Sequence, residues 1–173
     1  MATTKEQTQP ITRTVRFIPK PFNDVLAKLQ SSIKKEQPAS SPGGMSVLNH
    51  LDSKASFEAA TNAALGPHGF MQFEQWNHGS WMHLYGVHGG KQATRIVFGN
   101  PQIAITMLRH DVTAGLFVPV EALLVERDGG TEIVQIKPST LIAGADGSSE
   151  ELEAAAKVLD GKLEELWAYV ASD

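Results

Sequence analysis

The chain contains no cysteine. Disulfide bonds, thiolate catalysis, cysteine-based zinc sites and iron–sulfur clusters are therefore excluded. It also lacks any run of about 18 apolar residues, so no segment is expected to span a membrane. Its polar first ten residues lack the apolar core of a secretory signal. We therefore expect a soluble protein of the cytoplasm that has no membrane partner.

An excess of positive charge is missing as well. The 15 Lys and Arg residues are outnumbered by 19 Asp and Glu residues, which gives a formal net charge of −4. Proteins that bind nucleic acids gain much of their affinity from many contacts between basic side chains and phosphates. No nucleic-acid partner is expected. The basic residues near the start of the chain are interleaved with Asp24 and Glu36, which indicates a solvated face.

The length and hydrophobic content of the chain suit one domain. With 173 residues and 42% hydrophobic residues it can bury a core of its own. Residues 1–10 are polar and are expected to be disordered. Residues 11–173 are interpreted as a single domain. Within it, the segment at about 37–66 reads as a loop rich in Pro, Ser and Gly that is followed by a short helix.

Hydrophobic periodicity predicts both strands and helices. The predicted strands are 11–19, 70–76, 94–99 and the two arms of a hairpin within 115–138; the predicted helices are 20–36, 53–65, 101–110 and 148–170. Most neighbouring strands are joined by hairpins or short elements. The fold class is therefore α+β, with a curved, mostly antiparallel sheet, helices on one face and a long C-terminal helix.

Local signals mark where these elements begin and turn. Asp52 or Ser53, then Asn100 and finally Ser148 or Ser149 are expected to cap three helices. Asp128-Gly129-Gly130 is expected to supply the left-handed backbone positions of the hairpin turn. Gly161 interrupts the last helix, where glycine costs about 1 kcal/mol of helix propensity, and is expected to mark a kink or a close packing contact.

Residues 95–130 resemble the DUF302 family, whose fold is described as TT1751-like. The motif elements that carry this resemblance are Phe98-Gly99-Asn100-Pro101, Met107, Asp111, Leu116 with Pro119, and Asp128-Gly129. Pro21-Phe22 at the start of the first helix and Asn77-His78 at a strand end also fit. The resemblance covers about 12–37 and 69–143.

The resemblance implies a curved antiparallel sheet with a TBP-like architecture and a homodimer. It implies almost nothing about function, since the family is named for an unknown role. The chain departs from the family at two places: segment 37–66 has the character of an insertion after the first helix, and Asn77 stands where the family has an aspartate. The second departure removes a carboxylate partner for His78.

Three histidines, His78, His83 and His88, lie five residues apart in the stretch 74–90. Side chains five apart point to opposite faces of a strand and diverge on a helix. A zinc site needs three or four ligands around one point, and no HExxH motif accompanies these histidines. No metal site and no cofactor are predicted.

His78 is the candidate catalytic residue. It follows a predicted strand and precedes Gly79, where a sheet opens into a loop, and loops on rigid scaffolds often carry function. A neutral histidine there can act as a general base or donate a hydrogen bond to a ligand. The alternative is a histidine that bonds a backbone carbonyl and has only a structural role.

The candidate ligand-binding residues are Trp76, Trp81, His83, Tyr85, Arg95 and Asn100. We expect an apolar pocket between the sheet and the helices, in which these aromatic and polar side chains fix a ligand. The Gly-Asn-Pro at 99–101 can be read as an anion cradle at a helix start. It can equally be read as a turn, a cap and a first helical position.

Three functions stay open from the sequence. The first is binding of a small, partly apolar ligand. The second is a cofactor-independent enzyme of the isomerase, lyase or hydrolase type, with His78 as general base and Arg95 or the Asn100 region holding an anionic group. The third is a non-catalytic dimeric protein whose aromatic residues form the subunit interface.

Overall fold

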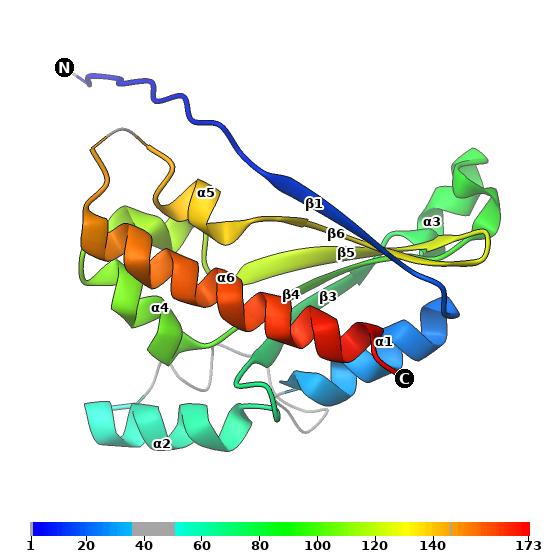
Figure 1. The fold of residues 1–173 in the computed structure, drawn as a ribbon, viewed down its shortest axis with the longest axis horizontal. Coiled ribbons are helices and arrows are strands. Elements are labelled where there is room, and N and C mark those ends of the chain that lie inside the picture. Colours follow the sequence, from blue (N-terminus) through cyan, green and yellow to red (C-terminus); the bar gives the residue numbers. More distant parts are fainter. Residues whose placement is uncertain (1, 36–50, 146) are drawn as a thin grey trace.

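A computed structural model gives the structure of this chain, and it describes residues 2–35, 51–145 and 147–173. Two layers are visible in Figure 1, a twisted sheet and a layer of helices. The predicted loop falls largely outside the described residues, and its interpretation as part of an insertion at 37–66 stays a prediction. The predicted α+β class is confirmed.

The strands and helices follow one another along the chain with short connections. In order they are β1 (Arg13–Ile18), α1 (Phe22–Ser32), β2 (Lys34–Lys35), α2 (Lys54–Ala64), β3 (Met71–Asn77), α3 (Gly79–Met82), η2 (His83–Tyr85), η3 (His88–Gly90), β4 (Ala93–Gly99), α4 (Pro101–Leu108), η4 (Val112–Leu116), β5 (Val120–Arg127), β6 (Gly130–Ile136), α5 (Pro138–Ile142) and α6 (Glu150–Ala171), where η marks a 3₁₀ helix.

The sheet has the strand order β1-β6-β5-β4-β3-β2. The first five strands pair antiparallel, and the two-residue β2 pairs parallel with β3. The mostly antiparallel sheet is therefore confirmed. β2 was not predicted, since the helix expected to run to residue 36 ends at Ser32.

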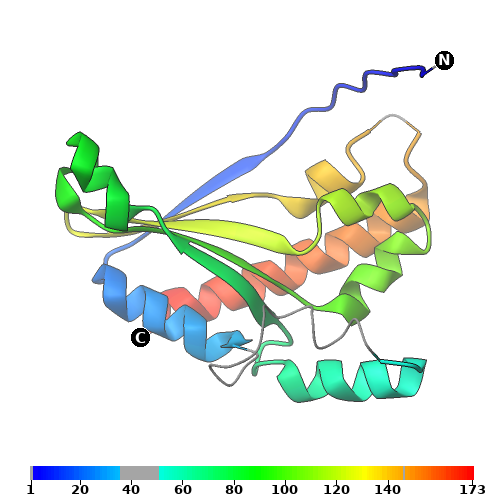
Figure 2. The same cartoon turned by 180° about the vertical axis from the view of Figure 1, so that it is seen from behind.

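The helices α1, α4 and α6 cover one face of the sheet, as Figures 1 and 2 show from both sides. The core of buried side chains lies between these helices and the sheet. Alternation along β4 buries Ile96 and Phe98 on the helix side, while Arg95 stays partly exposed on the other. Trp167 of α6 packs edge-on against Phe98 at a centroid distance of 5.9 Å. The face opposite the helices is called the open face below.

The predicted helix starts are confirmed. Ser53 forms a capping box with Ser56, Asn100 accepts a hydrogen bond from the Gln102 amide, and Ser149 accepts one from the Leu152 amide. Each cap satisfies a backbone N–H that the helix itself leaves without a partner. The end of β4 and the start of α4 are thus fixed by one residue, Asn100.

The region 115–138 differs in detail from the prediction. The first arm of the hairpin begins at Val120, because 112–116 forms η4. In the turn only Gly129 has a positive φ, +79°. Gly130 is needed for space: a Cβ there would lie 2.3 Å from the Ile18 carbonyl oxygen. The short helix α5 was not predicted.

The stretch between β3 and β4 forms a helical tip at one end of the sheet. It consists of α3, η2 and η3, and its turns use positive φ at Gly86, His88, Gly89 and Gly90. This tip carries most of the predicted aromatic and histidine residues, so its position decides where those residues lie.

Candidate functional site

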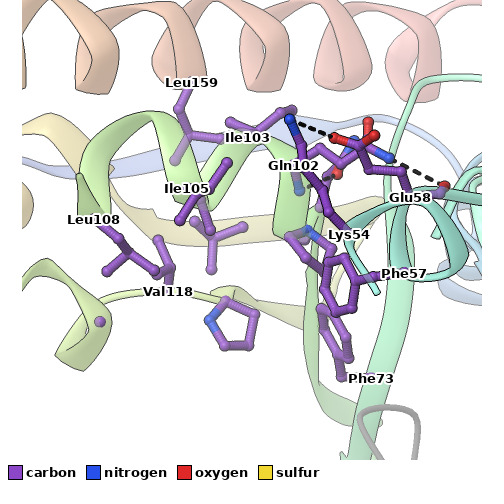
Figure 3. A pocket seen from close by; sticks show the side chains of 17 residues that line it. Lys54, Phe57, Glu58, Phe73, Gln102, Ile103, Ile105, Leu108, Val118 and Leu159 are labelled. Carbon is purple, nitrogen blue, oxygen red and sulfur yellow. Dashed lines mark hydrogen bonds and ion pairs between the residues drawn. The ribbon is translucent and has the colours of Figure 1, made fainter. Parts of the chain in front are cut away.

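An apolar pocket of about 520 Å³ opens between the sheet and the helices (Figure 3). Its size is typical of small-molecule sites. Four regions of the chain supply most of its wall. The apolar side chains are Phe57 from α2, Phe73 from β3, Ile103, Ala104, Ile105 and Leu108 from α4, and Val118, Pro119 and Val120 before and at the start of β5, with Leu159 from α6.

The pocket exists because the chain turns sharply from β4 into α4. Gly99 makes this turn beside Pro119 and Phe73: a Cβ at Gly99 would lie 3.2 Å from Pro119 Cβ and 3.3 Å from Phe73 Cε2. The irregular register of β3 between Gln72 and Glu74 sets Phe73 beside this turn. A glycine therefore lets three walls of the pocket approach one another.

The polar side chains around the pocket already have partners within the protein. Asn100 donates to the Gly69 carbonyl oxygen at 3.0 Å and caps α4. Gln102 donates to the Glu58 carbonyl oxygen and to Asn62 Oδ1. Lys54 pairs with Glu58 at 3.6 Å at the exposed edge drawn in Figure 3. The pocket thus offers a ligand an apolar wall with few free polar groups.

Of the seven predicted site residues, only Asn100 lines this pocket. The Asn100 side chain is occupied in the cap, which supports the structural reading of Gly-Asn-Pro. Sequence reasoning missed Phe57 and Phe73 as wall residues. Phe73 stands opposite Trp76 in the alternation of its strand, and this was the signal that the two aromatics serve different faces.

Trp76 and Arg95 lie on the open face. They are direct neighbours across β3 and β4, and Arg95 Cζ lies 5.2 Å from the centre of the Trp76 ring. Arg95 also donates a hydrogen bond from Nη2 to Glu121 on β5. The guanidinium is held between an aromatic ring and a carboxylate.

His78 lies beside these residues. Its backbone N–H donates to the Ala93 carbonyl oxygen, and its ring packs edge-on against Trp81 at 5.9 Å. His78 and Arg95 both line a hollow of about 250 Å³ on the open face, and His78 also lines a neighbouring hollow of about 310 Å³. The structure therefore brings Trp76, His78 and Arg95 together, away from the sheet–helix pocket.

Trp81, His83 and Tyr85 are exposed on the tip. Tyr85 has 78% of its surface exposed and Trp81 49%, and their rings meet edge-on at 6.4 Å. His83 Nδ1 lies 3.4 Å from the Gly79 carbonyl oxygen, and His88 Nε2 lies 3.0 Å from that of Glu126. These histidines therefore have separate surroundings.

Two features are absent from the described part of the chain. No group of three or more His, Asp and Glu residues there is arranged to hold a metal ion. No helix in the described ranges has the length and apolar character needed to cross a bilayer.

Comparisons with known proteins give a family and a fold. The family model of DUF302, a domain of unknown function, matches residues 49–166, which includes α2 and most of α6. The crystal structure of an uncharacterized conserved DUF302 protein from Bacillus stearothermophilus matches with a TM-score of 0.60 and 15% sequence identity. The match covers 91% of this chain and 96% of that chain, and at this identity it shows the fold alone. No curated protein matches the sequence.

Proposed function

The chain belongs to the DUF302 family, as its sequence motifs predicted, and we propose that it binds a small apolar ligand in the sheet–helix pocket. Because the family has no known function, this proposal rests on the geometry of the chain itself. The observation that carries the proposal is a cavity of about 520 Å³ with an almost wholly apolar wall. Burying apolar ligand surface there is favourable by roughly 25 cal/mol per Å².

The residues that line the pocket also indicate that the buried part of the ligand has no polar groups. Gln102 already donates both N–H groups of its side-chain amide, to the Glu58 carbonyl oxygen and to Asn62, so a ligand acceptor buried beside that amide would lose its water without gaining a bond from it. Such a loss costs about 1–3 kcal/mol. We therefore expect an aliphatic or aromatic body inside, with any polar group at the rim near Lys54.

A neutral fluorescent probe tests the pocket directly. N-phenyl-1-naphthylamine should bind the protein and gain fluorescence as it leaves water. The variant Ala104→Phe places a large side chain into the cavity from α4, and it should weaken probe binding about tenfold or more. Native mass spectrometry of the purified protein would show whether a ligand of this class is carried along.

The matched control is Ala168→Phe, which adds the same side chain at an exposed position of α6. It should leave the dissociation constant within about twofold of that of the unchanged protein. Equal probe binding by Ala104→Phe, with a folded circular dichroism spectrum, would contradict the pocket as the binding site.

A second candidate function is self-association through the tip. Trp81, Leu84 and Tyr85 are 49%, 72% and 78% exposed, and an apolar cluster of this kind is typical of an interface. The occupant that we propose is a second copy of the chain, as the family resemblance implied.

The enzyme hypothesis, with His78 as general base, requires chemistry on the open face. His78 does not line the sheet–helix pocket, and it lines the hollow on the open face together with Arg95. A substrate for His78 would therefore be a different molecule from the apolar ligand, or one bound at a different place.

A further inference from the structure

The open face holds a second potential site, centred on Arg95 and His78. Trp76 lies directly opposite Arg95 in the register of β3 and β4, and the His78 N–H bonds the Ala93 carbonyl two residues before Arg95. His78 is therefore the diagonal neighbour of Arg95 on the same face of an antiparallel pair. Diagonal neighbours lie about 7–8 Å apart at their backbones, within reach of long side chains.

Arg95 is held in place from two sides. The Trp76 ring lies against its guanidinium and Glu121 accepts from its Nη2. A guanidinium has five N–H donors in a rigid fork. Within the described ranges, Nη2 to Glu121 is the one hydrogen bond that this side chain makes. The remaining donors of this side chain have no hydrogen-bond partner among the described residues.

His78 is half-buried, and its ring is fixed by the edge-on contact with Trp81. Neither ring nitrogen has a hydrogen-bond partner in the part of the chain that the structure describes. A neutral imidazole still has one N–H to donate. The hollow is therefore lined by two residues that each have an N–H without a partner among the described residues, His78 and Arg95.

We propose that the 250 Å³ hollow binds a small carboxylate with a flat apolar body. The carboxylate matches the planar fork of Arg95, which favours bidentate contacts with carboxylates. Leu123, Val134 and Ile136 give the hollow an apolar floor, on which a ring would lie.

Both donors are needed because Glu121 is present. A second carboxylate beside Arg95 meets the negative charge of Glu121, and one guanidinium offsets only one of the two charges. The N–H of His78 supplies the further interaction that this arrangement requires. Loss of either Arg95 or His78 should therefore weaken binding.

This site is independent of the proposed apolar pocket. Of the residues lining that pocket, none is His78 or Arg95, and the two sites open on opposite faces of the sheet. A failure of one proposal therefore leaves the other standing.

Sodium benzoate is the probe for the carboxylate site, followed by ¹H–¹⁵N NMR of the whole chain. Benzoate should shift the amide signals of Arg95, Leu123 and Val134 and saturate at about millimolar concentration, as expected for so small a ligand. Benzamide has the same shape without the charge, and it should bind at least fivefold more weakly.

Two variants remove one donor each and keep the bulk of the side chain. Arg95→Met should weaken benzoate binding about tenfold or more, and His78→Phe, which keeps a ring against Trp81, about fivefold to tenfold. The matched controls are Arg16→Met, at an arginine that pairs with Glu164 instead, and His83→Phe on the tip. Both controls should stay within twofold.

The proposal fails if benzoate causes no shifts, or if its shifts centre on Phe57 and Phe73. It fails equally if a folded Arg95→Met protein binds benzoate unchanged. Should Arg95→Met lose its dispersed spectrum, Arg95→Lys provides the comparison. It keeps the charge but loses the fork, so it is expected to bind benzoate more weakly than the unchanged protein, and equal affinity would overturn the site.

Discussion

Two glycines of this chain have opposite environments. Gly161 is exposed in the middle of α6, and a Cβ added there meets nothing within 4 Å. The close packing contact that the sequence allowed at this position is therefore absent. Gly130 begins β6, where an added Cβ would lie 2.3 Å from the Ile18 carbonyl oxygen and 2.7 Å from Phe17 Cζ.

The same substitution should therefore have opposite effects on the free energy of unfolding. Gly161→Ala should raise it by about 0.5–1 kcal/mol, because alanine restricts the unfolded chain and favours the helix. Gly130→Ala should lower it by at least about 1–3 kcal/mol, since a backbone oxygen must give way. Urea denaturation of both variants measures the two shifts, and a fall in stability for Gly161→Ala would contradict this account.

For the predicted site residues, the sequence predicted the local position of a residue correctly but not the surface that its side chain lines. The sequence correctly placed His78 next to a strand end and Asn100 at a helix cap. It could not tell that Phe73 lines the sheet–helix pocket, since that position depends on a register irregularity of β3 between Gln72 and Glu74. Such a shift changes which side chains face a neighbour without changing the local pattern.

Among the elements, the short helix η4 depends on one carboxylate. Asp111 Oδ1 accepts hydrogen bonds from Thr113 Oγ1 at 2.7 Å and from the Thr113 backbone N–H at 2.8 Å. Both bonds favour the charged carboxylate, the side-chain bond most, and they hold the pKa of Asp111 below its usual value. The stability from this cap is present above the unfolded-state pKa of about 3.9 and is lost as the pH falls through the lower folded-state pKa.

Replacement of this cap should therefore give a pH-dependent loss of stability. Asp111→Ala should be less stable than the unchanged protein at pH 7, and the difference should shrink as the pH falls below about 4. Asp111→Asn keeps an acceptor that does not titrate and serves as the control. A difference between Asp111→Ala and the unchanged protein that is constant from pH 7 to pH 2.5 would show that the charge has no role in the cap.

On the scale of the whole molecule, two groups of aromatic residues lie far apart, one in the core and one on the tip. Phe70, Phe98 and Trp167 pack edge-on in the core, whereas Trp81 and Tyr85 remain exposed at the far end of the sheet. Burial of large apolar side chains is favourable, so this tip would gain from a partner.

If the tip joins two copies, light scattering should give twice the mass of one chain. The double variant Leu84→Ser with Tyr85→Ser should return the protein to a monomer. Val112→Ser is the control, since Val112 is 80% exposed and lies outside the tip. A monomeric unchanged protein at high micromolar concentration would remove the tip as an interface.

The sequence by itself determined the order of most elements, the cap at Asn100, the α+β class and the family, and it narrowed two further caps to Asp52 or Ser53 and to Ser148 or Ser149. These features follow from local periodicity and from side chains within a few residues of one another. It missed α5 and β2, which are too short to show a period.

Only the tertiary structure decided where the sites lie. The pocket takes its wall from segments as distant in the sequence as Phe57 and Leu159, and the carboxylate site depends on Arg95 meeting Trp76, His78 and Glu121 across three strands. A hydrophobic pattern states which face of an element is buried. Whether two buried faces fill the space between them depends on how the side chains of distant elements pack, and that is fixed only when the sheet and helices come together.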